Sequence, residues 1–298
     1  MKNILLLFLG ILSAPLLFSQ EGEPLDEDID VIIDNIIDLD DDYLMEMITD
    51  LNKYQVIYAS MDFNNKTYFL GRDLGLDQYN ITTQLIYQNS NGIFAGIAGN
   101  YYDKFDPKWD LTVLTAGYGI DFGKKDNFRA ELVYSRYIFS DATSNDFENS
   151  IDGRFYISTN DNAFGSSVNS SYLFGEKKGF QSSLSFYGDV KLIDLNAETG
   201  AKITLNPDLS FIFGSENIDT SRIDNLGIDI PFINRIVSSF ETFDLRNIQL
   251  QIPLVLELRN FHAEIGYNLN FPKKLEFENN LDNTSFFNVG LTYIFLLK

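Results

Sequence analysis

Charged and amide side chains at every second position are the residues of this sequence that could do chemistry. In residues 260–271, His262 and Glu264 alternate with apolar residues. Because successive side chains of a strand point to opposite faces, polar residues spaced in this way share one face. The set that we expect to face a common interior is Arg129, Glu131, Asp189, Lys191, Glu198, Lys202, Gln249, Gln251, Glu257, His262 and Glu264. Such side chains could line a narrow aqueous pore or fill it with salt bridges, and both interpretations stay open.

His262 is the only histidine in the chain. A hydrolytic site would pair it with a nucleophilic serine and an orienting acid or amide. No His-x-Ser motif occurs, because position 264 is a glutamate. We therefore expect His262 to make hydrogen bonds in the interior, we do not predict an enzyme, and a lipid hydrolase is the least favoured function.

Acidic runs raise the question of a metal site. Carboxylates at Asp38, Asp40, Asp41 and Asp42 would suit calcium, but their spacing is not that of an EF-hand loop. A solvated charge run is the favoured interpretation, and we predict neither a bound metal nor a cofactor. Acidic residues between the predicted strands could bind divalent cations that bridge lipopolysaccharide.

The elements that must position these residues are strands, because the hydrophobic pattern has period two from Tyr54 onward. About twelve segments have the ~10-residue length of tilted strands that cross a bilayer. They are Tyr54–Phe63, Gln78–Gln88, Gly92–Tyr102, Trp109–Phe122, Asn127–Phe139, Gly165–Phe174, Phe180–Leu192, Ala197–Leu205, Leu209–Gly214, Arg246–Leu258, Asn260–Phe271 and Ser285–Leu297. Arg154–Ser158 also looks extended, and we interpret it as the extension of a hairpin above the membrane.

The predicted connections alternate in length. The short ones are Asn89–Asn91, Gly123–Asp126, Gly175–Gly179, Asn206–Asp208 and the turn around Asn260, and most of the others are long. Barrels of the outer membrane have short periplasmic turns and longer external loops. The alternation therefore predicts an even number of strands with both ends of the barrel in the periplasm. Tyr118, Phe122, Tyr172 and Phe174 precede short turns, where we expect an aromatic girdle.

The last predicted strand shows the two faces clearly. Phe287, Val289, Leu291, Tyr293, Phe295 and Leu297 fall on one face, and small or polar residues fall on the other. A soluble β-sandwich also alternates, but its apolar face would pack against a second sheet. Large apolar side chains facing lipid and polar ones facing water explain both faces. We predict an all-β, antiparallel, up-and-down transmembrane β-barrel with a short acidic helical leader, whose last strand pairs with Tyr54–Phe63.

The N-terminal region has the pattern of an export signal followed by an acidic segment. Lys2 precedes an apolar run over 4–12, which predicts a cleaved signal peptide at 1–20. Isoleucines recur at helical spacing among carboxylates after it, so we expect an acidic, helix-forming periplasmic leader at 21–52 and the barrel at 53–298. The chain has 22 Lys+Arg and 43 Asp+Glu, a net charge of −21, which disfavours nucleic acid as a partner.

The segment Gly71-Arg72-Asp73-Leu74-Gly75, the signal ending in Phe18-Ser19-Gln20, the turns and the aromatic terminal strand resemble uncharacterised outer-membrane β-barrel proteins of Bacteroidetes-type bacteria. The resemblance implies the fold and the outer membrane and brings no activity with it. We expect lipid, lipopolysaccharide and the barrel-assembly machinery as partners. The favoured function is a passive channel or solute transporter, and the alternative is a structural or interaction barrel with an envelope protein as its partner.

Overall fold

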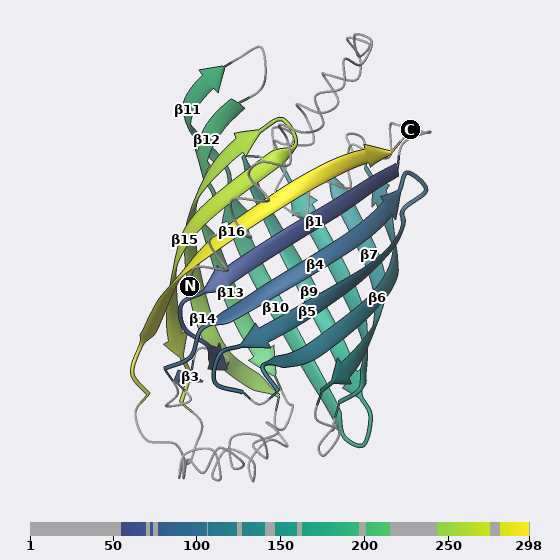
Figure 1. The fold of residues 1–298 in the computed structure, drawn as a ribbon, viewed down its shortest axis with the longest axis vertical. Helices are drawn as coiled ribbons and strands as arrows, with labels where there is room; N and C mark the ends of the chain where they lie inside the picture. The colour runs from purple at the N-terminus through teal and green to yellow at the C-terminus, as the bar shows by residue number, and fades with distance from the viewer. Residues whose placement is uncertain are drawn as a thin grey trace.

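Antiparallel strands that are each hydrogen-bonded to the next close on themselves to form a barrel (Figure 1). The computed structural model describes residues 55–69, 72–73, 77–105, 107–123, 127–140, 147–159, 163–196, 201–214, 243–274 and 281–297. Within these residues the barrel has 12 strands. No helix in the same residues is long and apolar enough to cross a membrane. The predicted signal peptide and acidic leader lie outside the described residues.

The barrel strands follow one another around the wall in chain order. Their bounds are β1 (Gln55–Asn64), β4 (Asn80–Asn89), β5 (Ile93–Tyr102), β6 (Trp109–Phe122), β7 (Phe128–Phe139), β8 (Asn149–Ser158), β9 (Phe164–Phe174), β10 (Lys178–Gly188), β13 (Asp208–Gly214), β14 (Asp244–Leu258), β15 (Phe261–Pro272) and β16 (Thr284–Leu297). A small hairpin, β2 (Tyr68–Phe69) and β3 (Arg72–Asp73), follows β1. The hairpin of β11 (Val190–Asn196) and β12 (Ala201–Leu205) projects above the rim (Figure 1).

The first and last strands close the barrel. β1 and β16 pair antiparallel from Gln55 opposite Leu297 to Asn64 opposite Asn288. The predicted closing pair is therefore confirmed, as is the antiparallel barrel. We call the end of the barrel with Gln55 and Leu297 the terminal end, and the opposite end, where β1 leads into β2, the loop end.

The strand number was predicted correctly through two errors of opposite sign. Arg154–Ser158 is not a hairpin extension, because it is part of β8, which pairs with β7 and β9 along the wall. Ala197–Leu205 and Leu209–Gly214 are not two crossings. β12 and β13 both pair with the same strand, β14, and lie end to end along it. One missed strand and one strand counted twice left the total unchanged.

The two errors also misplaced two turns. Asn206-Pro207-Asp208 is not a turn between crossings but the irregular junction between β12 and β13. The connection between β9 and β10, predicted on the periplasmic side with Gly175–Gly179, lies at the loop end instead. Tyr172 and Phe174 are therefore at the loop end, whereas Tyr118 and Phe122 lie toward the terminal end as predicted.

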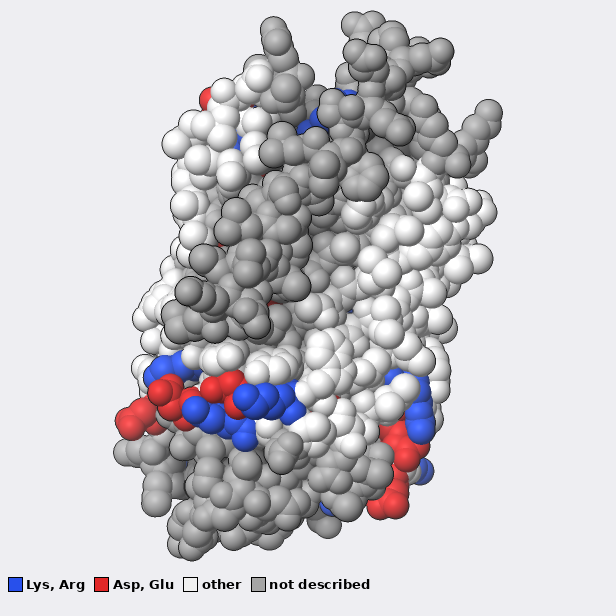
Figure 2. Space-filling model, viewed as in Figure 1, with Lys and Arg blue, Asp and Glu red and all other residues white. Residues whose placement is uncertain are grey.

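The two faces of the wall differ as the alternation predicts. Residues on the outer face are large, apolar and exposed, for example Leu132 and Ile265. Most of the described wall visible in Figure 2 is free of charged side chains, which gather in a band toward the loop end. On the inner face of the same strands, Val133 and Asn268 are buried. The barrel therefore has an apolar outside and a largely polar inside.

Candidate functional site

The inner face of the barrel is the candidate site, because it gathers buried polar and charged side chains from many strands. Those on the barrel strands include Ser60, Arg129, Ser135, Ser150, Asp152, Ser167, Ser185, Asn247, Glu257, Asn268 and Asn270. Buried polar groups need hydrogen-bond partners, since an unsatisfied one costs ~1–3 kcal/mol. The way these groups are satisfied shows how the interior is organised.

A cluster of charges lies on β6, β7 and β8. Arg129 donates from Nη1 to Asp121 Oδ1 at 2.9 Å and from Nε to Glu131 Oε1 at 2.7 Å. Arg154 Nη1 lies 3.6 Å from the other carboxylate oxygen, Glu131 Oε2. The Arg129, Asp121 and Glu131 side chains are almost completely buried, whereas that of Arg154 is 40% exposed. Two guanidinium groups thus share two carboxylates along the wall, and Arg154 is the most accessible member.

A second charged group lies toward the terminal end, on β12, β14 and β15. Lys202 Nζ lies 3.5 Å from Glu257 Oε2, and Thr204 Oγ1 donates to Glu257 Oε1 at 3.0 Å. His262 is opposite Glu257 in the β14–β15 register. Glu264, two residues further along β15, accepts a hydrogen bond of 2.6 Å from Asn288 Nδ2. Among the described residues, no group of three or more His, Cys, Asp or Glu residues could hold a metal ion.

Amides and hydroxyls form the remaining part of the inner wall. Asn270 Oδ1 accepts hydrogen bonds from Asn247 at 3.0 Å and from Gln249 at 3.2 Å. Gln251 donates to Gln249 at 3.4 Å, and Ser185 and Ser210 share a hydrogen bond of 2.7 Å. These bonds run along the wall between neighbouring strands or along one strand, so they stabilise the wall without spanning the lumen.

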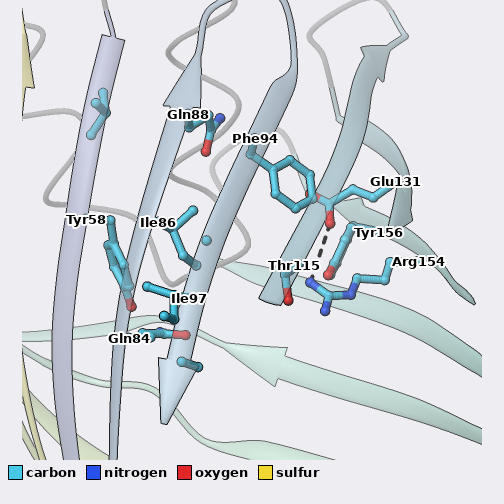
Figure 3. A pocket seen from close by; sticks show the side chains of 13 residues that line it. Tyr58, Gln84, Ile86, Gln88, Phe94, Ile97, Thr115, Glu131, Arg154 and Tyr156 are labelled. Carbon is cyan, nitrogen blue, oxygen red and sulfur yellow. Dashed lines mark ion pairs between the residues drawn. The ribbon is translucent and has the colours of Figure 1, made fainter. Parts of the chain in front are cut away.

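A cavity of about 240 Å³ lies on the inner side of the wall from β1 to β8 (Figure 3). Its lining is Val56, Tyr58, Gln84, Ile86, Gln88, Phe94, Gly96, Ile97, Ala98, Thr115, Glu131, Arg154 and Tyr156. Phe94 and Val133 are buried, and Ile86 packs against them. The lining thus combines aromatic rings, aliphatic side chains, amides, hydroxyl groups and one ion pair.

The remaining residues of the predicted interior set are placed differently. Asp189 lies at the break between β10 and β11 and is partly exposed. Lys191 lies on β11, where every residue is exposed, and its ammonium is 3.3 Å from Asp194 Oδ2. Glu198 lies outside the described residues. The assignment of these three side chains to the lumen stays a prediction.

The cavity was not found from the sequence, because β8 was not counted as a barrel strand. Ser150, Asp152, Arg154 and Tyr156 alternate with Ile151, Gly153, Phe155 and Ile157, which is the pattern used to identify the other strands. The predicted segment Arg154–Ser158 lacks the first five residues of β8, so the alternation was read over too short a stretch. The aromatic residues Tyr58 and Phe94 carry no such signal, since their roles depend on which strands are neighbours.

No family model matches this chain, and no curated protein matches it either. Solved barrels do resemble it in fold. A structure described as "KdgM porin" has a TM-score of 0.46 and 10% identity, over 80% of this chain and 98% of that one. A structure of the NanC porin has a TM-score of 0.43 and 9% identity, over 81% and 99% of the two chains.

The similarity to these porins concerns barrel architecture alone. Identities near 10% and TM-scores below 0.5 leave the function to be inferred from the residues of this chain. The resemblance to barrels of the Bacteroidetes type also stays a prediction. What the inner wall can do follows from its chemistry: it can hydrate a lumen, and the cavity can hold a small molecule.

Proposed function

We propose that this chain is an outer-membrane β-barrel through which small polar solutes pass. The observation that carries the proposal is the contrast between the two faces of one closed wall. Exposed apolar side chains recur around the outside, for example Leu85, Ile151, Phe186 and Ile265. A soluble monomer rarely exposes an apolar patch larger than a few hundred Å², whereas a barrel in lipid needs such a surface.

The connections support an orientation with the terminal end in the periplasm. At that end, β4 and β5 are joined by 90–92, β8 and β9 by 159–163, and β14 and β15 by 259–260. At the loop end, β13 and β14 are joined by the much longer segment 215–243. Short periplasmic turns and long external loops are typical of bacterial outer-membrane barrels. A cleaved signal peptide at 1–20 and recognition by the barrel-assembly machinery are parts of the same proposal.

The lumen is proposed to be aqueous because its polar groups bond mainly along the wall. Serines follow one another on neighbouring strands, such as Ser167 on β9, opposite Ser185 on β10. A hydrated lumen gives such hydroxyls further partners without a cost in desolvation. The transport would be passive, and the barrel would do no chemistry.

Conductance of the folded barrel in planar bilayers tests the proposal. The chain contains no cysteine, so a single cysteine can be modified by a charged thiol reagent. Ser183→Cys introduces it on the inner face of β10, and Leu184→Cys introduces it on the outer face one residue away. We expect discrete current steps, and we expect the reagent to reduce them only in S183C. Absence of current from the folded wild type, or equal block of both variants, would contradict the channel.

A structural or interaction barrel is the second candidate, and the β11–β12 hairpin favours it. Val190, Leu192, Ile193 and Leu195 are all exposed on β11, beyond the end of β10. β11 is also the last strand at one end of the sheet order, and a strand edge can pair with another chain. Co-purification after mild solubilisation of the outer membrane tests this second candidate. We expect a partner protein to co-purify with the wild type and to be lost when the hairpin is removed.

A further inference from the structure

The charged clusters of the inner wall are balanced, but the wall as a whole carries an excess of carboxylates. On β6, β7 and β8, two arginines share two carboxylates, and toward the terminal end Lys202 pairs with Glu257. These clusters contribute no net charge. The charge of the lumen therefore depends on the inner-face residues outside them.

The carboxylates outside these clusters lie on four different strands. They are Asp62 on β1, Asp152 on β8, Asp208 on β13 and Glu264 on β15. Each accepts a hydrogen bond from a neutral side chain, and the donors, in the same order, are Ser60, Ser150, Ser210 and Asn288. A neutral donor stabilises an ionised carboxylate and leaves its charge in place.

Among the described residues of the inner face, Arg246 is the base that remains outside the clusters. Its side chain is completely buried at the loop end, and its Nε donates to the backbone carbonyl of Gly214 at 2.8 Å. Asp62, Asp208 and Glu264, by contrast, are partly exposed. The chain as a whole has 22 Lys+Arg and 43 Asp+Glu, so the acidic excess is not confined to the wall. The surface that an ion in the lumen meets is therefore negative.

Asp62 and Glu264 lie on either side of one glycine. Both are opposite Gly290, in the β1–β16 and β15–β16 pairs. A Cβ atom built on Gly290 would lie 2.8 Å from Asp62 Oδ1 and 3.6 Å from Glu264 Cβ. Because this position has no side chain, the Asp62 carboxylate extends over β16 toward Glu264. Two negative charges thus flank a single strand, and their potentials add.

We propose that the lumen passes cations in preference to anions, and that Asp62 and Glu264 contribute most to this preference. Carboxylates that line a channel select cations because they raise the local concentration of counter-ions. The preference rests on the proposed channel, since it needs ion flow. Absence of current would contradict the channel and the preference together, whereas a current carried equally by both ions would contradict the preference alone.

The reversal potential of the folded full chain in planar bilayers measures the preference. An about tenfold KCl gradient at low salt is suitable, because the Debye length is ~30 Å at 0.01 M and ~10 Å at 0.1 M. We expect potassium to be about fivefold more permeant than chloride. Asp62→Asn combined with Glu264→Gln keeps side chains of similar shape and should lower this ratio to about two.

Glu176→Gln combined with Asp194→Asn is the matched control variant. It removes the same charge, but Glu176 is exposed in the turn between β9 and β10, and Asp194 is exposed on the β11–β12 hairpin. The permeability ratio of this variant should match that of the wild type. Ser183→Lys adds a positive charge to the inner face of β10 and should also lower the ratio. It keeps the test valid should D62N/E264Q not fold.

Three results would overturn the proposal: a wild type that passes chloride as readily as potassium, an unchanged ratio in folded D62N/E264Q or S183K, or an equal fall of the ratio in the control variant. Circular dichroism of each variant establishes that the barrel is folded.

Discussion

The backbone N–H of Asn206 donates a hydrogen bond of 3.1 Å to the carbonyl oxygen of Pro253, at the point where β12 gives way to β13. On either side of this bond, Leu205 is opposite Leu254 and Asp208 is opposite Gln251. The chain therefore continues along β14 through Pro207 rather than reversing. Since the fixed φ of proline is compatible with an extended chain, the residue removes a donor without forcing a turn.

This junction predicts that the projecting hairpin can be removed without loss of the barrel. A variant in which Asn-Gly replaces Val190–Leu205 keeps the barrel strands and loses only the pairing of β12 with β14. Glu257→Gln accompanies the deletion, because the deletion removes Lys202 and Thr204, which both contact the Glu257 carboxylate. We expect a folded barrel, measured by heat-modifiable migration in gel electrophoresis and by circular dichroism. Failure of this variant to fold, with E257Q alone folding normally, would mean that the hairpin is part of the wall.

Arg129 is predicted to stabilise the wall strongly. Its side chain is 5% exposed and bonds two carboxylates that are themselves buried. Arg129→Ala leaves Asp121 and Glu131 without this partner, and losing one member of a buried ion pair costs ~3–5 kcal/mol. Urea unfolding of the barrel in lipid vesicles measures the loss of unfolding free energy.

The control for Arg129 is Arg136→Ala, which breaks the much more exposed pair with Glu148. Exposed pairs contribute about 0–1 kcal/mol, so this variant should unfold nearly like the wild type. Equal losses of unfolding free energy in both variants would mean that burial does not strengthen the ion pairs of Arg129.

The fold was largely predictable from the sequence, because alternation depends on local residues alone. The faces of β15 and β16 follow from their own side chains, and Tyr293 is exposed while Ile294 is buried as the pattern requires. The errors arose where a local signal competed with distant pairing. Asn206-Pro207-Asp208 has good turn chemistry, but the available partner was β14, about fifty residues later in the chain.

The candidate site was less predictable than the fold. Arg129 and Glu131 could be named from one strand, since they lie two residues apart on β7. Arg154 and Tyr58 join the same cavity from strands on either side, and no spacing in the sequence relates them. The order of strands around the wall brings them together, so the cavity could be located only in the folded chain.

A charge on the outer face is predicted to be costly only at mid-height. Ile265 lies within β15 and Phe164 is the first residue of β9, and both side chains are 64% exposed. Ile265→Arg should lose ~2–4 kcal/mol of unfolding free energy, whereas Phe164→Arg at the rim should lose ~0–1 kcal/mol. Unfolding from lipid vesicles measures both. Equal and small losses would mean that lipid does not surround the wall. The two side chains have the same exposed fraction, so without lipid a charge should cost the same at both positions.

Gly117 is predicted to keep the Phe94 ring against the wall. A Cβ atom at this position would collide with the ring and with the backbone of Leu132. Gly117→Val should therefore displace the Phe94 ring and lower the unfolding free energy by about 1–3 kcal/mol. The control is Gly153→Val on β8, where nothing lies within 4 Å of the added Cβ. Urea unfolding of both variants in lipid vesicles measures the effect. A G117V barrel as stable as G153V would show that the ring position does not depend on this glycine.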